Sequence, residues 1–163
     1  MHKLLYQTQN TTTFLIFSPK YGEKECLIDS ENWDKIKHSH LSIIEHSNLF
    51  YVRCNKILLH RIFLNITNSK IFIDHKNHNG LDNRMNNLRI STNAQNQWNQ
   101  RLRKDNTSGF KGVSFFQGKW MSLIRFNNKK IFLGLFNDKI EAAIAYNNKA
   151  KELFGNFAYT NKI

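Results

Sequence analysis

The sequence predicts an α+β protein built from short antiparallel strands and a few helices. Short runs of β-branched, aromatic and aliphatic residues recur along the chain, separated by turn residues such as Asn and Gly. Helical patterns are fewer, and the clearest of them lies near the C-terminus. With 163 residues, of which 40% are hydrophobic and 13% aromatic, the chain is expected to fold as one domain or as several small modules.

Residues 1–56 are predicted to form a small N-terminal α+β unit. Two strands are expected at 13–17 and 24–28, around a turn at Pro19 and Gly22. A short helix is expected next, at residues 31–37, followed by two more strands at 41–45 and 49–54. A further strand at 57–60 is expected directly after this unit. Together these patterns predict a small α+β unit with low net charge.

Residues 57–105 are predicted to form a second unit of strand, long loop, strand and helix. The first strand, 70–75, ends in two polar residues, and a polar loop follows it at 76–87. A second strand is expected at 88–91. Thr92 is then a suitable N-cap for a helix over about 93–103.

Residues 106–163 are predicted to form a three-stranded antiparallel sheet packed on one helix. Strand patterns cover residues 111–116, 120–126 and 130–136, and Gln117-Gly118 and Asn127-Asn128 are typical hairpin turns. Asp138 and Glu141 have the spacing of a capping box, which marks the start of the last helix. That helix has many Ala residues on one face, which allows close packing on a sheet, and Gly155 is expected to end it.

The charge is strongly positive and unevenly distributed. The formal net charge is +12. Residues 1–59 carry seven Lys/Arg and six Asp/Glu, a net +1, which leaves +11 for residues 60–163. Such an imbalance predicts a polyanionic partner, either a nucleic acid or an acidic membrane surface. The sequence has no apolar run long enough to span a membrane and no basic amphipathic helix, so nucleic acid is favoured.

The chain has no pattern of a secretory signal peptide, and we expect it to be intracellular. Its two cysteines, Cys26 and Cys54, do not form a CxxC motif. This excludes a thiolate zinc knuckle and favours a reducing compartment, so no structural zinc is expected.

The strongest chemical signal is the pair Asp74-His75, followed by Asn87 and Asn96. Carboxylate and amide oxygens suit a hard divalent cation, and Mg²⁺ usually takes few protein ligands. Asp74 at a strand end and Asn96 in the first turn of the next helix are expected to reach one ion, if hairpin and helix pack together. His75 has a reference pKa near neutrality, which suits proton abstraction from water.

The run IDHKNHNGLDNRMNNLRISTNAQN, residues 73–96, resembles the signature of HNH endonucleases in the form found in phage and intron-encoded homing enzymes. The segment LLHRIFL, residues 58–64, matches what precedes that signature. The resemblance implies a ββα-metal fold in which His75 is the general base, Asp74 and Asn96 hold Mg²⁺ or alternatively Mn²⁺, and Asn87 braces the loop. It also implies hydrolysis of a DNA phosphodiester. His60 and Arg61 either support this site, contact a phosphate, or only pack.

Residues 107–161 resemble the APETALA2-type DNA-binding domain of plant transcription factors. The match includes Lys111-Gly112-Val113, Gly118-Lys119-Trp120, Leu133-Gly134-Leu135-Phe136 and Glu141-Ala142-Ala143. The resemblance implies a sheet laid in the DNA major groove with the helix behind it. The expected DNA contacts are Lys111, Ser114, Phe116, Lys119, Arg125, Lys130 and Phe132. Ser114, Phe116 and Leu123 replace charged residues of the plant pattern, so a different and more A/T-rich target is expected.

Arg101, Arg103 and Lys104 join the two modules and are either a solvated helix end or a segment that tracks the DNA backbone. We favour the second interpretation. The sequence as a whole therefore predicts a site-specific homing-type endonuclease that cuts double-stranded DNA by a one-metal mechanism, as a monomer or homodimer. The alternative is a sequence-specific DNA-binding regulator whose HNH site is inactive.

Overall fold

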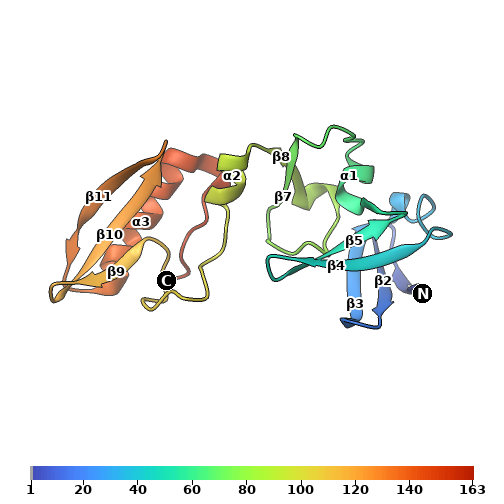
Figure 1. The fold of residues 1–163 in the computed structure, drawn as a ribbon, viewed down its shortest axis with the longest axis horizontal. Helices are drawn as coiled ribbons and strands as arrows, with labels where there is room; N and C mark the ends of the chain where they lie inside the picture. Colours follow the sequence, from blue (N-terminus) through green and yellow to red (C-terminus); the bar gives the residue numbers. More distant parts are fainter. Residues whose placement is uncertain (1) are drawn as a thin grey trace. The chain divides into compact units, whose positions relative to one another are not determined.

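The computed structural model describes residues 2–163 as a set of short antiparallel sheets with few helices (Figure 1). This agrees with the predicted α+β class. The chain divides into two compact units, one up to Thr92 and one from Asn93 to the C-terminus. The predicted boundaries at 56/57 and 105/106 do not coincide with this division and remain a prediction.

The first unit contains two three-stranded antiparallel sheets with sequential strand order. Their strands are β1 (His2–Gln7), β2 (Thr11–Ser18) and β3 (Gly22–Asp29) in one sheet, and β4 (Leu41–His46), β5 (Leu49–Cys54) and β6 (Ile57–Leu58) in the other. Alternate residues of these strands meet in one apolar core. Its fully buried members include Phe14, Ile16, Cys26, Ile28, Val52 and Leu59.

Two predictions for this unit are corrected by the structure, and one strand was missed. The helix expected at 31–37 is wrong: only a 3₁₀ turn, η1 (Ser30–Asn32), forms, followed by turns. This segment offers only Trp33 and Ile36 for burial, too little apolar surface to favour a longer helix. The strand expected at 57–60 ends at Leu58, where α1 (Leu59–Phe63) begins and buries Leu59 and Phe63 in the core. Strand β1 was not predicted.

A two-stranded antiparallel hairpin completes the first unit. It consists of β7 (Phe72–His75) and β8 (Leu88–Ser91), and a 3₁₀ turn, η2 (Met85–Asn87), precedes β8. The predicted strand 88–91 is confirmed, whereas the predicted strand 70–75 begins only at Phe72.

The second unit starts with α2 (Asn93–Trp98), which is shorter than the helix predicted over 93–103. Lys111 Nζ donates to the carbonyls of Trp98 and Gln100. A longer helix would need these two carbonyls as acceptors for its own main-chain hydrogen bonds.

The rest of the second unit is a three-stranded antiparallel sheet with one helix on one of its faces (Figure 1). The strands are β9 (Val113–Phe116), β10 (Lys119–Phe126) and β11 (Lys129–Phe136), with β10 in the centre. Helix α3 (Lys139–Phe154) covers the face that carries Ser122 and Ile124, and a 3₁₀ turn, η3 (Gly155–Phe157), follows it. This arrangement of sheet and helix is as predicted.

The turns and caps of this unit follow the local sequence. Asp138 Oδ1 accepts hydrogen bonds from the main-chain nitrogens of Ile140 and Glu141 at 2.5 and 3.3 Å, as an N-cap does. The hairpin turns have positive φ at both central residues, Gln117-Gly118 and Asn127-Asn128, which is the twist that two-residue hairpins favour.

None of the helices within residues 2–163 is long and apolar enough to cross a membrane. Cys26 and Cys54 are both buried and are not joined in a disulfide. Burial raises the pKa of the Cys26 thiol to about 12, so it remains protonated.

Gly112 should be the least replaceable glycine of the second unit. It has φ of +76°, and an added Cβ would lie 2.1 Å from Cδ2 of the buried Tyr146 ring. Gly118 has a similar φ of +79° but open space around it. We expect Gly118→Ala to lower the free energy of unfolding by about 1 kcal/mol through backbone strain. Gly112→Ala should cost clearly more in urea denaturation, and equal losses would contradict this account of Tyr146.

Candidate active site

The candidate site lies at the end of β7, where Asp74 and His75 are each only 6% exposed. The antiparallel register with β8 pairs Arg89 with Asp74. Arg89 Nε and Nη2 donate to Asp74 Oδ2 at 2.8 and 2.5 Å. A buried carboxylate is costly unless it is paired, so Arg89 compensates the burial of Asp74.

His75 is enclosed by side chains from three other segments. The ring centroids of His60 and Tyr51 lie 5.1 and 5.8 Å from that of His75. Asn83 Oδ1 lies 3.4 Å from His75 Nε2. Burial lowers the pKa of His75 below its ordinary value, although Asn83 and nearby carboxylates act in the opposite direction. The imidazole is therefore neutral near pH 7, the form that accepts a proton.

Helix α1 supplies His60 and Arg61, the two residues predicted to support the site. His60 is buried, and burial, together with neighbouring His75 and Arg61, lowers the pKa of His60 to about 3. Arg61 Nη1 donates to the carbonyl of Ile71 at 3.0 Å, and Nη2 donates to the carbonyl of Asn68. The Arg61 guanidinium thus holds the segment that leads into β7.

Asn87 joins both ends of the loop between β7 and β8. Its Oδ1 accepts from the main-chain nitrogen of Asn77 at 3.0 Å, and its Nδ2 donates to the carbonyl of Asp82 at 2.8 Å. Its own carbonyl accepts from the main-chain nitrogen of Lys76 at 2.9 Å. These bonds cross the loop, and the importance of Asn87 for activity stays a prediction.

Sequence reasoning missed several residues that surround His75. Asp82 is 1% exposed and accepts from Arg84 Nε and Nη2, both at 2.8 Å, and from Asn77 Nδ2 at 2.8 Å. Burial alone would raise the pKa of Asp82, but Arg84 holds it below its ordinary value. The other residues that sequence reasoning missed are Tyr51, Asn83 and Arg89. No local sequence pattern marks these residues, because tertiary packing brings them to the site.

Asn96, the second predicted metal ligand, lies on α2 in the other compact unit and is half-buried. Within residues 2–163, no group of three or more His, Cys, Asp or Glu could hold a metal ion. A hard divalent ion does not need such a group, since it binds few protein oxygens and keeps several waters. The carboxylate of Asp74 and the amide oxygen of Asn96 have the chemistry that such an ion requires.

Comparison with known proteins relates residues 67–98 to a known family. A family model described as HNH endonuclease matches residues 67–98. An uncharacterized HNH endonuclease of Acanthamoeba polyphaga mimivirus is 36% identical over 96 residues, 58% of this chain and 49% of that protein. Protein 3.8 of Escherichia phage T7 is 32% identical over 89 residues, 53% of this chain and 73% of that protein. Residues 67–98 therefore belong to an HNH endonuclease domain, and the chain is homologous to an HNH endonuclease.

The chain spans about half the length of the mimivirus protein. No solved structure matches it. Asp74, His75, Asn87 and Asn96 all lie within the HNH match at residues 67–98, whereas His60 and Arg61 precede it.

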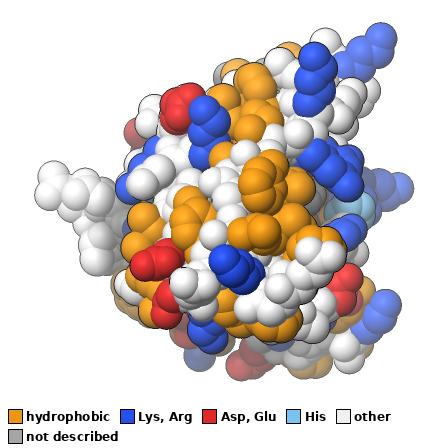
Figure 2. Space-filling view, turned by 90° about the vertical axis from the view of Figure 1, so that its left-hand side faces the viewer, with side chains coloured by type: hydrophobic (Ala, Val, Ile, Leu, Met, Phe, Trp, Pro, Cys, Tyr) orange, Lys and Arg blue, Asp and Glu red, His pale blue; other side chains and the backbone are white. Residues whose placement is uncertain are grey.

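Most residues expected to bind DNA outside the HNH match are exposed on the face of the second unit's sheet that points away from α3. Register places Lys119 beside Phe116 and Arg125 beside Lys130. Figure 2 views the molecule from the side of this sheet and shows hydrophobic side chains with Lys and Arg among them. The exposed predicted contacts on this face are Ser114, Phe116, Lys119, Arg125, Lys130 and Phe132.

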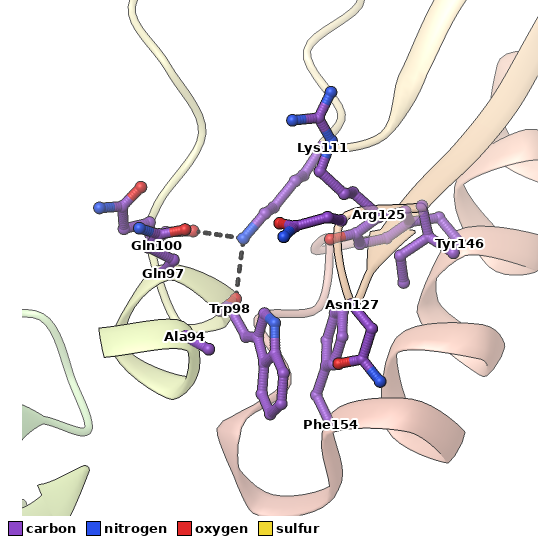
Figure 3. A pocket seen from close by; sticks show the side chains of 11 residues that line it. Ala94, Gln97, Trp98, Gln100, Lys111, Arg125, Asn127, Tyr146 and Phe154 are labelled. Carbon is purple, nitrogen blue, oxygen red and sulfur yellow. Dashed lines mark hydrogen bonds between the residues drawn. The ribbon is translucent and has the colours of Figure 1, made fainter. Parts of the chain in front are cut away.

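Lys111 is placed differently from these residues. It is half-buried, and its Nζ donates to the carbonyls of Trp98 and Gln100 at 2.8 Å each (Figure 3). Burial lowers the pKa of Lys111 to about 8. The ammonium therefore holds the end of α2 against this unit, and a role of Lys111 in DNA binding stays a prediction.

Lys111 borders a cavity of about 410 Å³ that lies within the second unit (Figure 3). Trp98 forms one wall and stacks on Phe154, with ring centroids 4.6 Å apart. Arg125 also lines the cavity, and the lining includes no acidic residue. The last predicted contacts, Arg101, Arg103 and Lys104, are exposed in the segment between α2 and β9.

The buried neutral imidazole of His60 should make the stability of the protein depend on pH. The unfolded chain binds a proton at His60 below its ordinary pKa of 6.5, whereas the folded chain does so only near 3. Stability is therefore lost as the pH falls through 6.5 toward 3. Between pH 7 and 5 this amounts to at most about 2 kcal/mol, measured by urea denaturation.

His60→Leu should remove this contribution and so show a smaller loss of unfolding free energy over the same interval. Val52→Ala removes buried apolar atoms but no titrating group, so it should keep the wild-type pH dependence. An equal pH dependence in wild type and His60→Leu would contradict the interpretation.

Proposed function

We propose that the protein is a homing-type DNA endonuclease that hydrolyses a phosphodiester with one divalent metal ion and His75 as general base. The observation that carries this proposal is the buried Asp74-His75 pair at the end of β7, inside the segment that matches the HNH endonuclease family. A neutral imidazole and a carboxylate side by side are what a metal-assisted phosphodiester hydrolysis with a general base uses.

His75 accepts the proton of the water that attacks the phosphorus atom. Its neutral form is the one present near pH 7, because burial lowers its pKa. The carboxylate of Asp74 lies next in the chain and favours the imidazolium that proton transfer creates. Arg89 orients Asp74, while Tyr51 limits the movement of the imidazole ring.

Asp74 and Asn96 would hold the divalent ion, most simply Mg²⁺ and alternatively Mn²⁺. When bound, such an ion offsets the negative charge that develops on the phosphate and the leaving oxygen. Asn87 keeps the loop beside the site in shape through its bonds to Asn77 and Asp82. His60 supports the His75 ring, and Arg61 supports the strand below it.

The second unit supplies the DNA-binding surface, in the manner of the APETALA2-type domain that residues 107–161 resemble. What supports this is a sheet face with exposed cations next to exposed apolar side chains. Arg125 and Lys130 suit guanine edges or phosphates, and Phe116 and Phe132 suit thymine methyl groups. Lys111, Ser114 and Lys119 belong to the same proposed surface, and Arg101, Arg103 and Lys104 would follow the DNA backbone toward the nuclease.

Replacing His75 with Ala should abolish metal-dependent cleavage and leave DNA binding intact. The test incubates wild type and His75→Ala with supercoiled plasmid in Mg²⁺ or EDTA, and measures binding in EDTA. Loss of a general base typically lowers the rate by about 10²–10⁴-fold. Salt-sensitive binding by the wild type without cleavage in any divalent metal would instead favour the alternative, a DNA-binding regulator with an inactive HNH site.

Two separate substitutions, Arg125→Ala and Lys130→Ala, should each weaken DNA binding and reduce its dependence on salt concentration. Each lost phosphate contact lowers the slope of log K against log salt concentration by about one unit. Lys151→Ala on α3, which covers the opposite face of the sheet, serves as the charge-matched control and should leave the slope unchanged. If all three variants behave alike in filter-binding titrations, the sheet face is not the DNA-binding surface.

A further inference from the structure

We propose that Asn83 is a positioning residue that holds the proton of His75 on Nε2 and thereby makes Nδ1 the basic nitrogen. This inference rests on the proposed function of His75 as general base. Asn83 does not contact the reacting atoms itself in this assignment. It acts through His75, and its side chain is almost completely buried, at 1% exposure.

The hydrogen bonds around the Asn83 amide determine which way it points. Its Nδ2 lies 3.4 Å from the carbonyl oxygen of Gly80 and 3.6 Å from Cys26 Sγ. A carbonyl oxygen only accepts, so the amide nitrogen must face Gly80. The amide oxygen must then face His75, where Oδ1 lies 3.4 Å from Nε2.

This orientation of the Asn83 amide fixes the tautomer of His75. Asn83 Oδ1 only accepts, so the hydrogen bond requires a proton on His75 Nε2. A neutral imidazole carries one N–H and one lone pair, so Nδ1 carries the lone pair. The opposite tautomer would place two acceptors against each other in a buried site, which is unfavourable.

Asn83 is itself held by the N-terminal sheet. Its main-chain nitrogen donates to the carbonyl of Leu27 at 2.7 Å, and the nitrogen of Leu27 donates to the carbonyl of Leu81 at 2.9 Å. Leu27 and Asp82 form a parallel bridge, so the loop docks along β3. Residues far upstream of the HNH match thus set the position of Asn83, the partner of His75. In this proposal the N-terminal sheet therefore serves to position the site.

His75 has little freedom to turn away from Asn83. The rings of His60 and Tyr51 pack edge-on against it from α1 and β5, with interplanar angles of 79° and 60°. Rotation of the imidazole would have to displace one of these rings. Packing therefore fixes the ring plane, and Asn83 fixes which nitrogen carries the proton.

The first test is the tautomer of His75, measured by nitrogen-15 NMR of the wild-type protein without DNA or metal. We expect protonated Nε2, with an N–H resonance that exchanges slowly with water. In Asn83→Leu this protected resonance should be lost. A wild-type His75 protonated on Nδ1, or an unchanged His75 spectrum in Asn83→Leu, would overturn the proposal. The wild-type spectrum decides this even if the variant fails to fold.

The second test compares cleavage rates at saturating DNA with DNA affinity in EDTA. Asn83→Leu should lower the cleavage rate by about 10- to 100-fold, as loss of a histidine-orienting partner commonly does, with affinity unchanged. Asn86→Leu makes the same substitution at an exposed position of the loop and should cleave at the wild-type rate. Equal rates for wild type and Asn83→Leu would also overturn the proposal.

These two tests separate failure of this proposal from failure of the proposed function. If the wild type does not cleave DNA, the endonuclease assignment fails, while the NMR spectrum still decides whether Asn83 fixes the tautomer of His75.

Discussion

Leu27 of β3 makes two main-chain hydrogen bonds to the loop between β7 and β8, and the geometry of the candidate site depends on this docking. The loop, residues 76–87, is almost entirely polar and has no apolar core of its own. A polar loop of this length keeps one conformation only if other elements bind it. Asp29 adds a further anchor, because its Oδ2 accepts from the main-chain nitrogen of Met85 at 2.7 Å.

On its other side, the loop packs closely against β5. At Gly80 an added Cβ would lie 2.4 Å from the carbonyl oxygen of Phe50 and 2.6 Å from the Tyr51 ring. The absence of a side chain lets the loop contact β5 directly. Tyr51 is thereby pressed between Gly80 and His75, so the loop, β5 and the proposed base form one packed group.

The buried charges of this group are balanced within the chain. Asp74 is paired with Arg89, and Asp82 with Arg84, so each buried carboxylate has a cationic partner. The two imidazoles instead become neutral, since burial lowers the pKa of both His60 and His75. This division matters for the proposed chemistry. Protonated carboxylates would be poor metal ligands, and a protonated imidazole could not act as a base.

The parts of the structure that could be predicted from the sequence are those fixed by local patterns. The strand ending in Asp74-His75, the hairpin turn at Asn127-Asn128 and the cap at Asp138 each follow from a few neighbouring residues. Asn83 could not be found in this way, because Cys26 and Leu27, which hold it beside His75, lie more than fifty positions away in the chain. The end of α2 at Trp98 was missed for the same reason, since Lys111 determines it.

The charge distribution implies that, in the proposed endonuclease, DNA affinity and cleavage rate depend differently on salt concentration. Most of the positive charge lies after residue 59. In the proposed complex its exposed members would act on DNA through solvent, where salt screens charges within about 8 Å at physiological ionic strength. His75 and Asp74 are buried beside their partners, and screening of buried pairs is much weaker. Salt should therefore change how much DNA is bound far more than how fast bound DNA is cut. A cleavage rate measured below saturation mixes the two effects, so only the rate of the saturated complex reports on the residues around His75.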